Sequence, residues 1–124
     1  MQDMRILPCT ERYRAAGQGR LHQEEGGGAW CPRKMIDMEH LLQEFLEVDL
    51  LSQHVISSVV VQGRYDNGLG QEYTEHYVLM YWREDDTTWH QYMEGDNRLL
   101  QANINTYQPV QHTLRDPVIT SKVR

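Results

Sequence analysis

The 124-residue chain has no excess of positive charge. Twelve lysines and arginines stand against eighteen aspartates and glutamates, which gives a formal net charge of −6. Proteins that bind nucleic acids depend on cationic side chains that displace counterions from phosphates. A net negative chain opposes that binding, so we expect no nucleic-acid partner.

Long apolar runs are also missing. No segment approaches the roughly 18 apolar residues that span a bilayer, and the start, MQDMRILPCTERYR, lacks the apolar core of a secretory signal. We therefore expect that any transmembrane segment would lie outside this sequence. The two cysteines, Cys9 and Cys31, are too few to indicate a redox compartment. They could pair, stay free, or each have a partner outside this chain.

Motifs for catalysis and cofactor binding do not occur in the sequence. There is no Walker A pattern, no nucleophile elbow and no kinase catalytic loop. Gly68-Leu69-Gly70 copies part of a dinucleotide-binding fingerprint, but Tyr73 replaces the third glycine, and the residues that follow alternate as in a strand. We therefore expect neither enzymatic activity nor a cofactor.

Metal-binding patterns are equally weak. The six histidines lack the i, i+4 spacing of a helical zinc pair. Cys9, His22 and Cys31 could meet only if the fold brought them together, and nothing in their spacing indicates that it does. We expect no metal site, and we expect the histidines to lie on the surface or across strands.

The chain is organised around residues 45–73. Leu46 to Leu50 alternates apolar and acidic residues, as a half-buried strand does. His54 to Gln62 is rich in β-branched residues on both faces, which predicts a central and well-buried strand. Tyr73 to Trp82 alternates again, and the Asn67-Gly68 pair before it predicts a tight turn.

The flanking segments add short elements to this unit. Three glycines before Trp30 indicate a turn that inserts the indole into a core, and Met35 to Phe45 has near-helical apolar spacing. Further turns are expected at Asp85–Thr88 and Gly95–Asn97, and short strands at Leu99–Leu100, Val110–Leu114 and Ile119–Val123. Short strands separated by turns predict one all-β domain of the sandwich or barrel type.

Two charged residues bracket the loop between the strands expected at His54–Gln62 and Tyr73–Trp82. Arg64 ends one strand, Glu72 begins the next, and such positions can face each other across an antiparallel pair. Geometry alone allows an exposed salt bridge worth about 0–1 kcal/mol. It equally allows a brace for a ligand-binding loop that presents Tyr65, Asp66 and Leu69.

Several longer stretches resemble one known family. The chain is similar to the discoidin domain, also called the coagulation-factor C-type domain, and most of all to the copy found in discoidin domain receptors. The resemblance lies in Gly19–Pro32 (GRLHQEEGGGAWCP), Phe45–Leu50 (FLEVDL), Val59–Arg64 (VVVQGR) and Gly68–Tyr73 (GLGQEY), and continues through YVLMYWREDDTTWHQY and LRDPVITSKVR.

The resemblance implies a discoidin-like jelly-roll β-sandwich over residues 15–124, after a non-family lead-in at residues 1–14. It also implies that the chain ends before the final strands, which would leave the sandwich incomplete with an exposed edge. Cys31 matches a family cysteine whose partner would lie beyond Arg124, while Cys9 matches none.

In function, the resemblance implies a non-catalytic extracellular adhesion or receptor module that binds triple-helical collagen. Arg64 and Glu72 match residues that line the collagen trench, whereas Thr10, Arg14 and Gly27 replace three other trench residues. The parent receptor could form a dimer and carry a tyrosine kinase outside this chain.

Two other ligands remain open at the level of sequence. Related domains insert apolar loop tips into anionic phospholipid, and Tyr65 and Leu69 could serve as such tips, although few cations surround them. A glycan-binding module is the other alternative, with Tyr65 as the aromatic residue placed to stack on a sugar.

Overall fold

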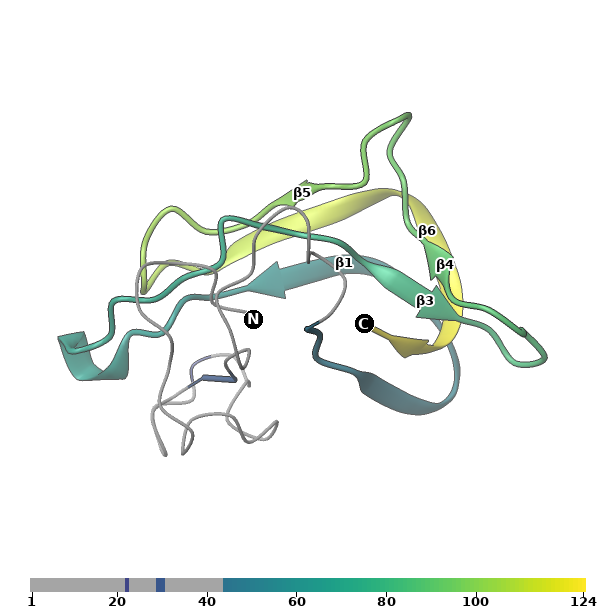
Figure 1. The fold of residues 1–124 in the computed structure, drawn as a ribbon, viewed down its shortest axis with the longest axis horizontal. Coiled ribbons are helices and arrows are strands. Elements are labelled where there is room, and N and C mark those ends of the chain that lie inside the picture. Colours follow the sequence, from purple (N-terminus) through teal and green to yellow (C-terminus); the bar gives the residue numbers. More distant parts are fainter. Residues whose placement is uncertain (1–21, 23–28, 31–43) are drawn as a thin grey trace.

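The computed structural model describes residue 22, residues 29–30 and residues 44–124. The regular elements in this part are strands, apart from one short 3-10 turn (Figure 1). This confirms the all-β prediction. The helical spacing at Met35–Phe45 falls almost entirely outside the described residues, as do Cys9 and Cys31. The elements are β1 (Val48–Val61), η4 (Asp66–Gly68), β2 (His76–Tyr77), β3 (Met80–Trp82), β4 (His90–Gln91), β5 (Leu100–Gln101) and β6 (Val110–Val123).

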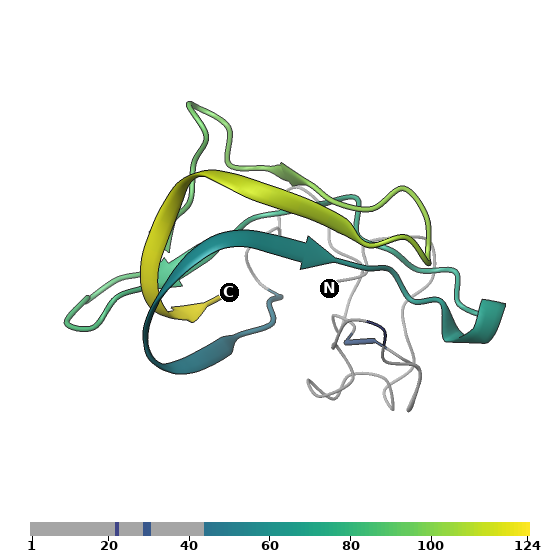
Figure 2. The ribbon, with the colours of Figure 1, turned by 180° about the vertical axis from the view of Figure 1, so that it is seen from behind.

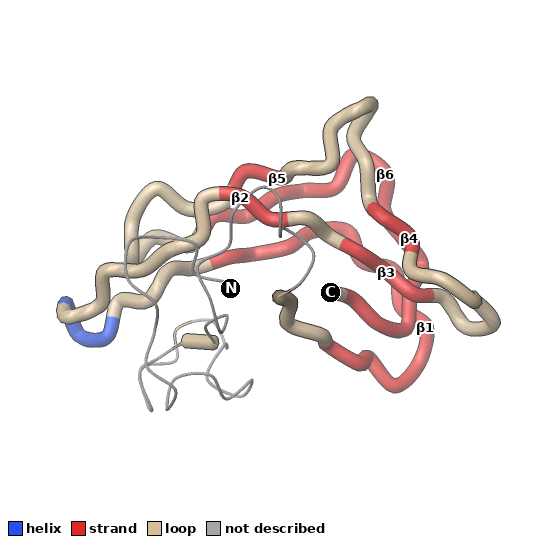
Figure 3. The backbone as a smooth tube through the Cα atoms, viewed as in Figure 1, coloured by secondary structure: helices blue, strands red, loops and turns tan. Residues whose placement is uncertain are grey.

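The strands form two antiparallel sheets, consistent with the discoidin sandwich. One has four strands in the order β1-β6-β3-β4, and the other pairs β2 with β5. Figure 3 shows how little of the chain outside β1 and β6 is regular strand. These two 14-residue strands, which pair with each other, are therefore the frame that supports the shorter elements.

The predicted strands at Leu46–Leu50 and His54–Gln62 merge into the single strand β1. The ladder shifts register between Asp49 and His54, and Leu51 there has a left-handed φ of 67°. The expectation of a central, best-buried strand is wrong for the part of the chain that the structure describes: among those strands β1 lies at an edge of the four-stranded sheet, and Val55 is 64% exposed. β-branched residues favour the extended backbone, but they do not require burial on both faces.

The predicted strands at Val110–Leu114 and Ile119–Val123 also join, forming β6. Ile56 pairs with Val118 and Ser58 with Thr113, so residues 114–117 stand opposite Ser57 alone. Pro117 lies in this bulge, where a proline costs no ladder hydrogen bond. The two long strands curve together through a pronounced bend, which Figure 2 shows from behind.

The predicted strand at Tyr73–Trp82 is instead divided between the two sheets. β2 pairs with β5 and β3 pairs with β4 and β6, with Leu79 between them. Leu79 is 5% exposed, and its carbonyl accepts a 2.9 Å hydrogen bond from Tyr92 N. Burial of this side chain holds the chain where it crosses from one sheet to the other.

A small apolar core lies between the strands. Its buried members are Leu79, Tyr92, Leu100, Leu114 and Val118. Beside it is an apolar cavity of about 250 Å³, bounded mainly by β1 and by residues 77–79. Trp30 is also buried, with 9% of its surface exposed.

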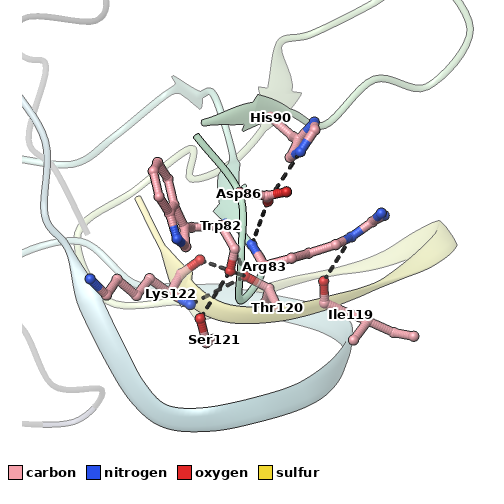
Figure 4. Close-up of polar contacts among 8 residues, drawn as sticks. All are labelled: Trp82, Arg83, Asp86, His90, Ile119, Thr120, Ser121 and Lys122. Atoms are coloured by element: carbon pink, nitrogen blue, oxygen red, sulfur yellow. Dashed lines mark hydrogen bonds and ion pairs between the residues drawn. The ribbon is translucent and has the colours of Figure 1, made fainter. Parts of the chain in front are cut away.

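A buried threonine joins β3 to β6 (Figure 4). Thr120 is fully buried, and its Oγ1 lies 2.7 Å from the carbonyl oxygen of Trp82 and accepts a 3.0 Å hydrogen bond from Trp82 N. The same oxygen lies 2.6 Å from the carbonyl of Lys122. This contact satisfies backbone groups at a place where the two strands share few ladder bonds.

Candidate functional site

The loop from Arg64 to Glu72 is closed at its base by its two end residues. Arg64 N donates a 2.8 Å hydrogen bond to the carbonyl of Glu72, and Arg64 Nη1 donates another of 2.8 Å to Glu72 Oε2. The two side chains are only 9% and 8% exposed. The alternative interpretation as an exposed salt bridge is therefore wrong, and the pair is an internal brace.

The brace extends into the loop itself. Glu72 Oε2 also accepts a 3.0 Å hydrogen bond from Gln71 N, so one carboxylate oxygen holds both the guanidinium and the loop backbone. Hydrogen bonds to an ionised group are roughly twice as strong as neutral ones. The base of the loop is thus fixed by charge-assisted contacts.

The tip of the loop is the turn that Asn67-Gly68 predicts. Asn67 has a φ of 53° and Gly68 a φ of 90°, and the amides of Gly68 and Gly70 both donate to the carbonyl of Tyr65, at 2.9 and 2.8 Å. The strands on either side of the turn, β1 and β2, do not pair with each other as in a β-hairpin, because β1 pairs with β6 and β2 pairs with β5.

Gly70 is required by close packing inside this loop. A Cβ placed on it would lie 1.9 Å from the carbonyl oxygen of Arg64. Any side chain at this position would push the loop away from the brace, so the Gly-rich sequence and the Arg64–Glu72 pair depend on each other.

The loop presents two apolar side chains to solvent. Tyr65 is 42% exposed and Leu69 is 79% exposed. Both are among the predicted site residues, and the fold brings them together with Arg64 and Glu72 in one loop. Asp66 belongs to the same turn, although its side chain lies outside the described part, and its role stays a prediction.

A second loop, residues 103–108, lies beside the first one and was not predicted as part of the site. Figures 1 and 2 show the two loops at the same end of the molecule, away from the β3–β4 turn. The ring of Tyr107 meets that of Tyr65 edge to face, with centroids 6.4 Å apart. The signal available in the sequence was a polar NINTYQ segment carrying a single aromatic residue.

Two histidines pair with carboxylates elsewhere in the fold. His90 Nε2 lies 3.1 Å from Asp86 Oδ2 within the β3–β4 turn (Figure 4), and His112 on β6 contacts Glu94. A hydrogen bond from Arg83 N lowers the pKa of Asp86, and the hydrogen bond with His112 lowers the pKa of Glu94.

Tyr77 is a further titratable group, and Glu94 acts on it. Burial, with a smaller contribution from Glu94, raises its pKa to about 12.

Across residues 44–124 and the three described residues before them, no three metal-ligating side chains gather, and no helix is long and apolar enough to cross a membrane.

Comparison with known proteins identifies the family. The model of the F5/8 type C domain matches residues 9–124, and the chain belongs to this family, as the resemblance predicts. The Discoidin domain-containing receptor A of Caenorhabditis elegans is 39% identical over 112 residues, covering 85% of this chain and 13% of the receptor.

Two further relatives also match this chain over part of their own length. The human Epithelial discoidin domain-containing receptor 1 is 40% identical over 70 residues, which covers 56% of this chain and 7% of the receptor. The mouse Retinoschisin is 29% identical over 111 residues, covering 88% of this chain and 46% of that protein. The chain thus spans a small part of the receptors it matches, and the F5/8 type C domain is a non-catalytic module.

Proposed function

We propose that this chain is the ligand-binding module of an extracellular receptor and that its ligand is triple-helical collagen. The binding edge would be the loop from Tyr65 to Gln71, flanked by Arg64 and Glu72. The observation that carries the proposal is the buried 2.8 Å contact between Arg64 and Glu72, which fixes a loop whose tip exposes Tyr65 and Leu69.

A rigid loop suits this task because association must compensate for any ordering of the binding surface. The brace at the base and the paired amide bonds to Tyr65 at the tip supply this order before a ligand arrives. Exposed apolar side chains on such a loop can then contribute contact area. Asp66 is proposed as a further contact at the same tip.

The surroundings of the module are also proposals. The chain covers 13% of the worm receptor that it resembles, so dimerisation, a membrane anchor and a tyrosine kinase would all belong to the rest of a longer parent protein. The binding step proposed for this chain depends on none of them.

Two alternative ligands compete for the same edge. Leu69, 79% exposed at the tip, is a candidate for insertion into anionic phospholipid. Between residues 62 and 72, however, Arg64 is the only cation, so the electrostatic attraction of about 1 kcal/mol per Lys or Arg is largely missing. Tyr65 remains the residue that would stack on a glycan.

The test must remove the brace without leaving a buried charge unpaired. The double variant Arg64→Met/Glu72→Leu replaces both groups with apolar side chains of similar size, which buried ion pairs often tolerate. We expect it to fold but to lose at least tenfold in affinity for immobilised fibrillar collagen, measured by surface plasmon resonance.

The matched control is a second arginine–glutamate pair. Arg124 Nε lies 2.8 Å from Glu47 Oε1, near the C-terminal end and away from the loop (Figure 1). Arg124→Met/Glu47→Leu should bind collagen like the unchanged chain. The proposal fails if the unchanged chain binds phosphatidylserine vesicles or glycans but not collagen, or if the folded loop variant binds collagen with unchanged affinity.

A further inference from the structure

The loop at residues 103–108 is held in place by side-chain hydrogen bonds. Asn105 Oδ1 accepts hydrogen bonds from the amides of Tyr107 and Gln108, at 3.2 and 2.8 Å. Asn103 is 2% exposed, and its Nδ2 donates to the carbonyls of Val61 (2.8 Å) and Gln108 (3.3 Å). The loop is therefore closed on itself and tied to the end of β1.

This loop also packs directly against the start of the Arg64–Glu72 loop. Gln62 Nε2 donates a 2.9 Å hydrogen bond to the carbonyl of Tyr107. A Cβ added to Gly63 would lie 2.8 Å from Thr106 Cα and 2.9 Å from Asn105 O, so the two backbones are nearly in contact. The position of one loop fixes the position of the other.

The surface that residues 103–108 contribute to the two joined loops exposes apolar side chains and carries no charge. Ile104 is 70% and Tyr107 60% exposed, next to Tyr65 at 42%. Residues 103–108 carry no charge. The Tyr65 and Tyr107 rings are in contact, so they expose one continuous apolar surface, and contiguous exposed apolar surface is typical of interaction sites.

We propose that the 103–108 loop is the second wall of the ligand edge, with Tyr107 as a contact residue for a neutral polyproline-II strand of a triple helix. This inference rests on the proposed function and adds residues to its site. Proline-rich strands in this conformation dock on aromatic-lined surfaces, and each collagen chain has this geometry. Two tyrosine rings set edge to face at 6.4 Å supply such a surface.

The chemistry of the surface favours this occupant over a lipid headgroup. A phosphate would need cations, and the 103–108 wall has none, while the Arg64 guanidinium is engaged by Glu72. A neutral strand rich in pyrrolidine rings needs apolar contact area and a few backbone hydrogen bonds. Tyrosine provides such area with little loss of side-chain freedom.

The test compares two variants of Tyr107. We expect Tyr107→Ala to lower affinity for immobilised fibrillar collagen about tenfold, and Tyr107→Phe, which keeps the ring, to lower it less than threefold. Ile119→Ala is the control, because Ile119 is also an exposed apolar residue, at 52%, but lies on β6 opposite Val55. Circular dichroism and the thermal transition verify the fold of each variant.

The outcomes separate this inference from the proposed function. If Tyr107→Ala is folded and binds like the unchanged chain while the Arg64/Glu72 double variant loses binding, the second wall is wrong and the collagen site stands. If the unchanged chain does not bind collagen at all, both are overturned. Equal losses for Tyr107→Ala and Ile119→Ala would also overturn the inference, because the effect would then not be specific to this loop.

Discussion

Arg64 and Glu72 form a buried ion pair, with 2.8 Å between Nη1 and Oε2, at the base of the loop that we propose binds ligand. The same two residues share a 2.8 Å backbone hydrogen bond. Because this pair holds the proposed binding loop, both stability and ligand affinity should be measured for each variant of the pair.

Arg64→Ala should destabilise the domain, because it leaves the Glu72 carboxylate buried beside a single remaining amide donor. Removing one partner of a buried pair costs about 3–5 kcal/mol, and we expect the lower end here because Gln71 N still donates. Chemical denaturation gives the value. The double variant Arg64→Met/Glu72→Leu should recover most of the loss; equal destabilisation by the single and double variants would contradict the account.

Gly70→Ala should disrupt the loop far more than Gly68→Ala. The added Cβ at Gly70 would lie 1.9 Å from the Arg64 carbonyl oxygen, whereas at Gly68 the nearest atom is Tyr65 Oη at 3.9 Å. Gly68 has a φ of 90°, so Gly68→Ala carries only backbone strain of about 1–2 kcal/mol.

Gly95→Ala is the control for that comparison, since Gly95 has a φ of 61° and open space around it. Gly68→Ala and Gly95→Ala should shift the thermal midpoint by similar amounts. If Gly70→Ala is as mild as these two, the close approach at Arg64 does not govern the loop.

Thr120→Val should lower stability by about 1–3 kcal/mol, because partly buried backbone groups of Trp82 and Lys122 would lose the hydroxyl as a hydrogen-bond partner. The substitution keeps the shape of the side chain, so packing changes little. Ser121→Ala removes only a 3.2 Å contact to the Trp82 carbonyl and serves as the milder control. The free energy of unfolding in urea measures both, and equal effects would contradict the role of Thr120.

Acid should weaken the contact between β6 and the turn after β4. The pKa of Glu94 is lowered below its usual 4.5 by the hydrogen bond with His112, so the stability it contributes is present above pH 4.5 and is lost as the pH falls through the lowered pKa. Glu94→Gln should flatten the fall of the thermal midpoint in that range.

His112→Asn should have a similar effect, and the double variant should add little to either single change. Additive effects in the double variant would show that Glu94 and His112 act independently. The carbon-13 shift of the Glu94 carboxylate, followed by NMR during acid titration, reports the pKa directly.

The sequence by itself determined the elements and the family. Alternation and β-branched content predicted the strand regions, Asn67-Gly68 predicted the turn found with two positive φ values, and the quoted motifs indicated the F5/8 type C domain that the comparisons identify. These signals are local. They depend on backbone preference over a few residues, so they predict which residues are extended but not where a strand ends or with which strand it pairs.

Only the tertiary structure decided burial, pairing and neighbours. It placed β1 at an edge of the described sheet with Val55 exposed, divided Tyr73–Trp82 between two sheets, and decided between two open interpretations of Arg64 and Glu72 by burying the pair. It also brought Tyr107 to Tyr65 across 42 positions of sequence. Such relationships arise when distant segments pack, and no local pattern of residues contains them.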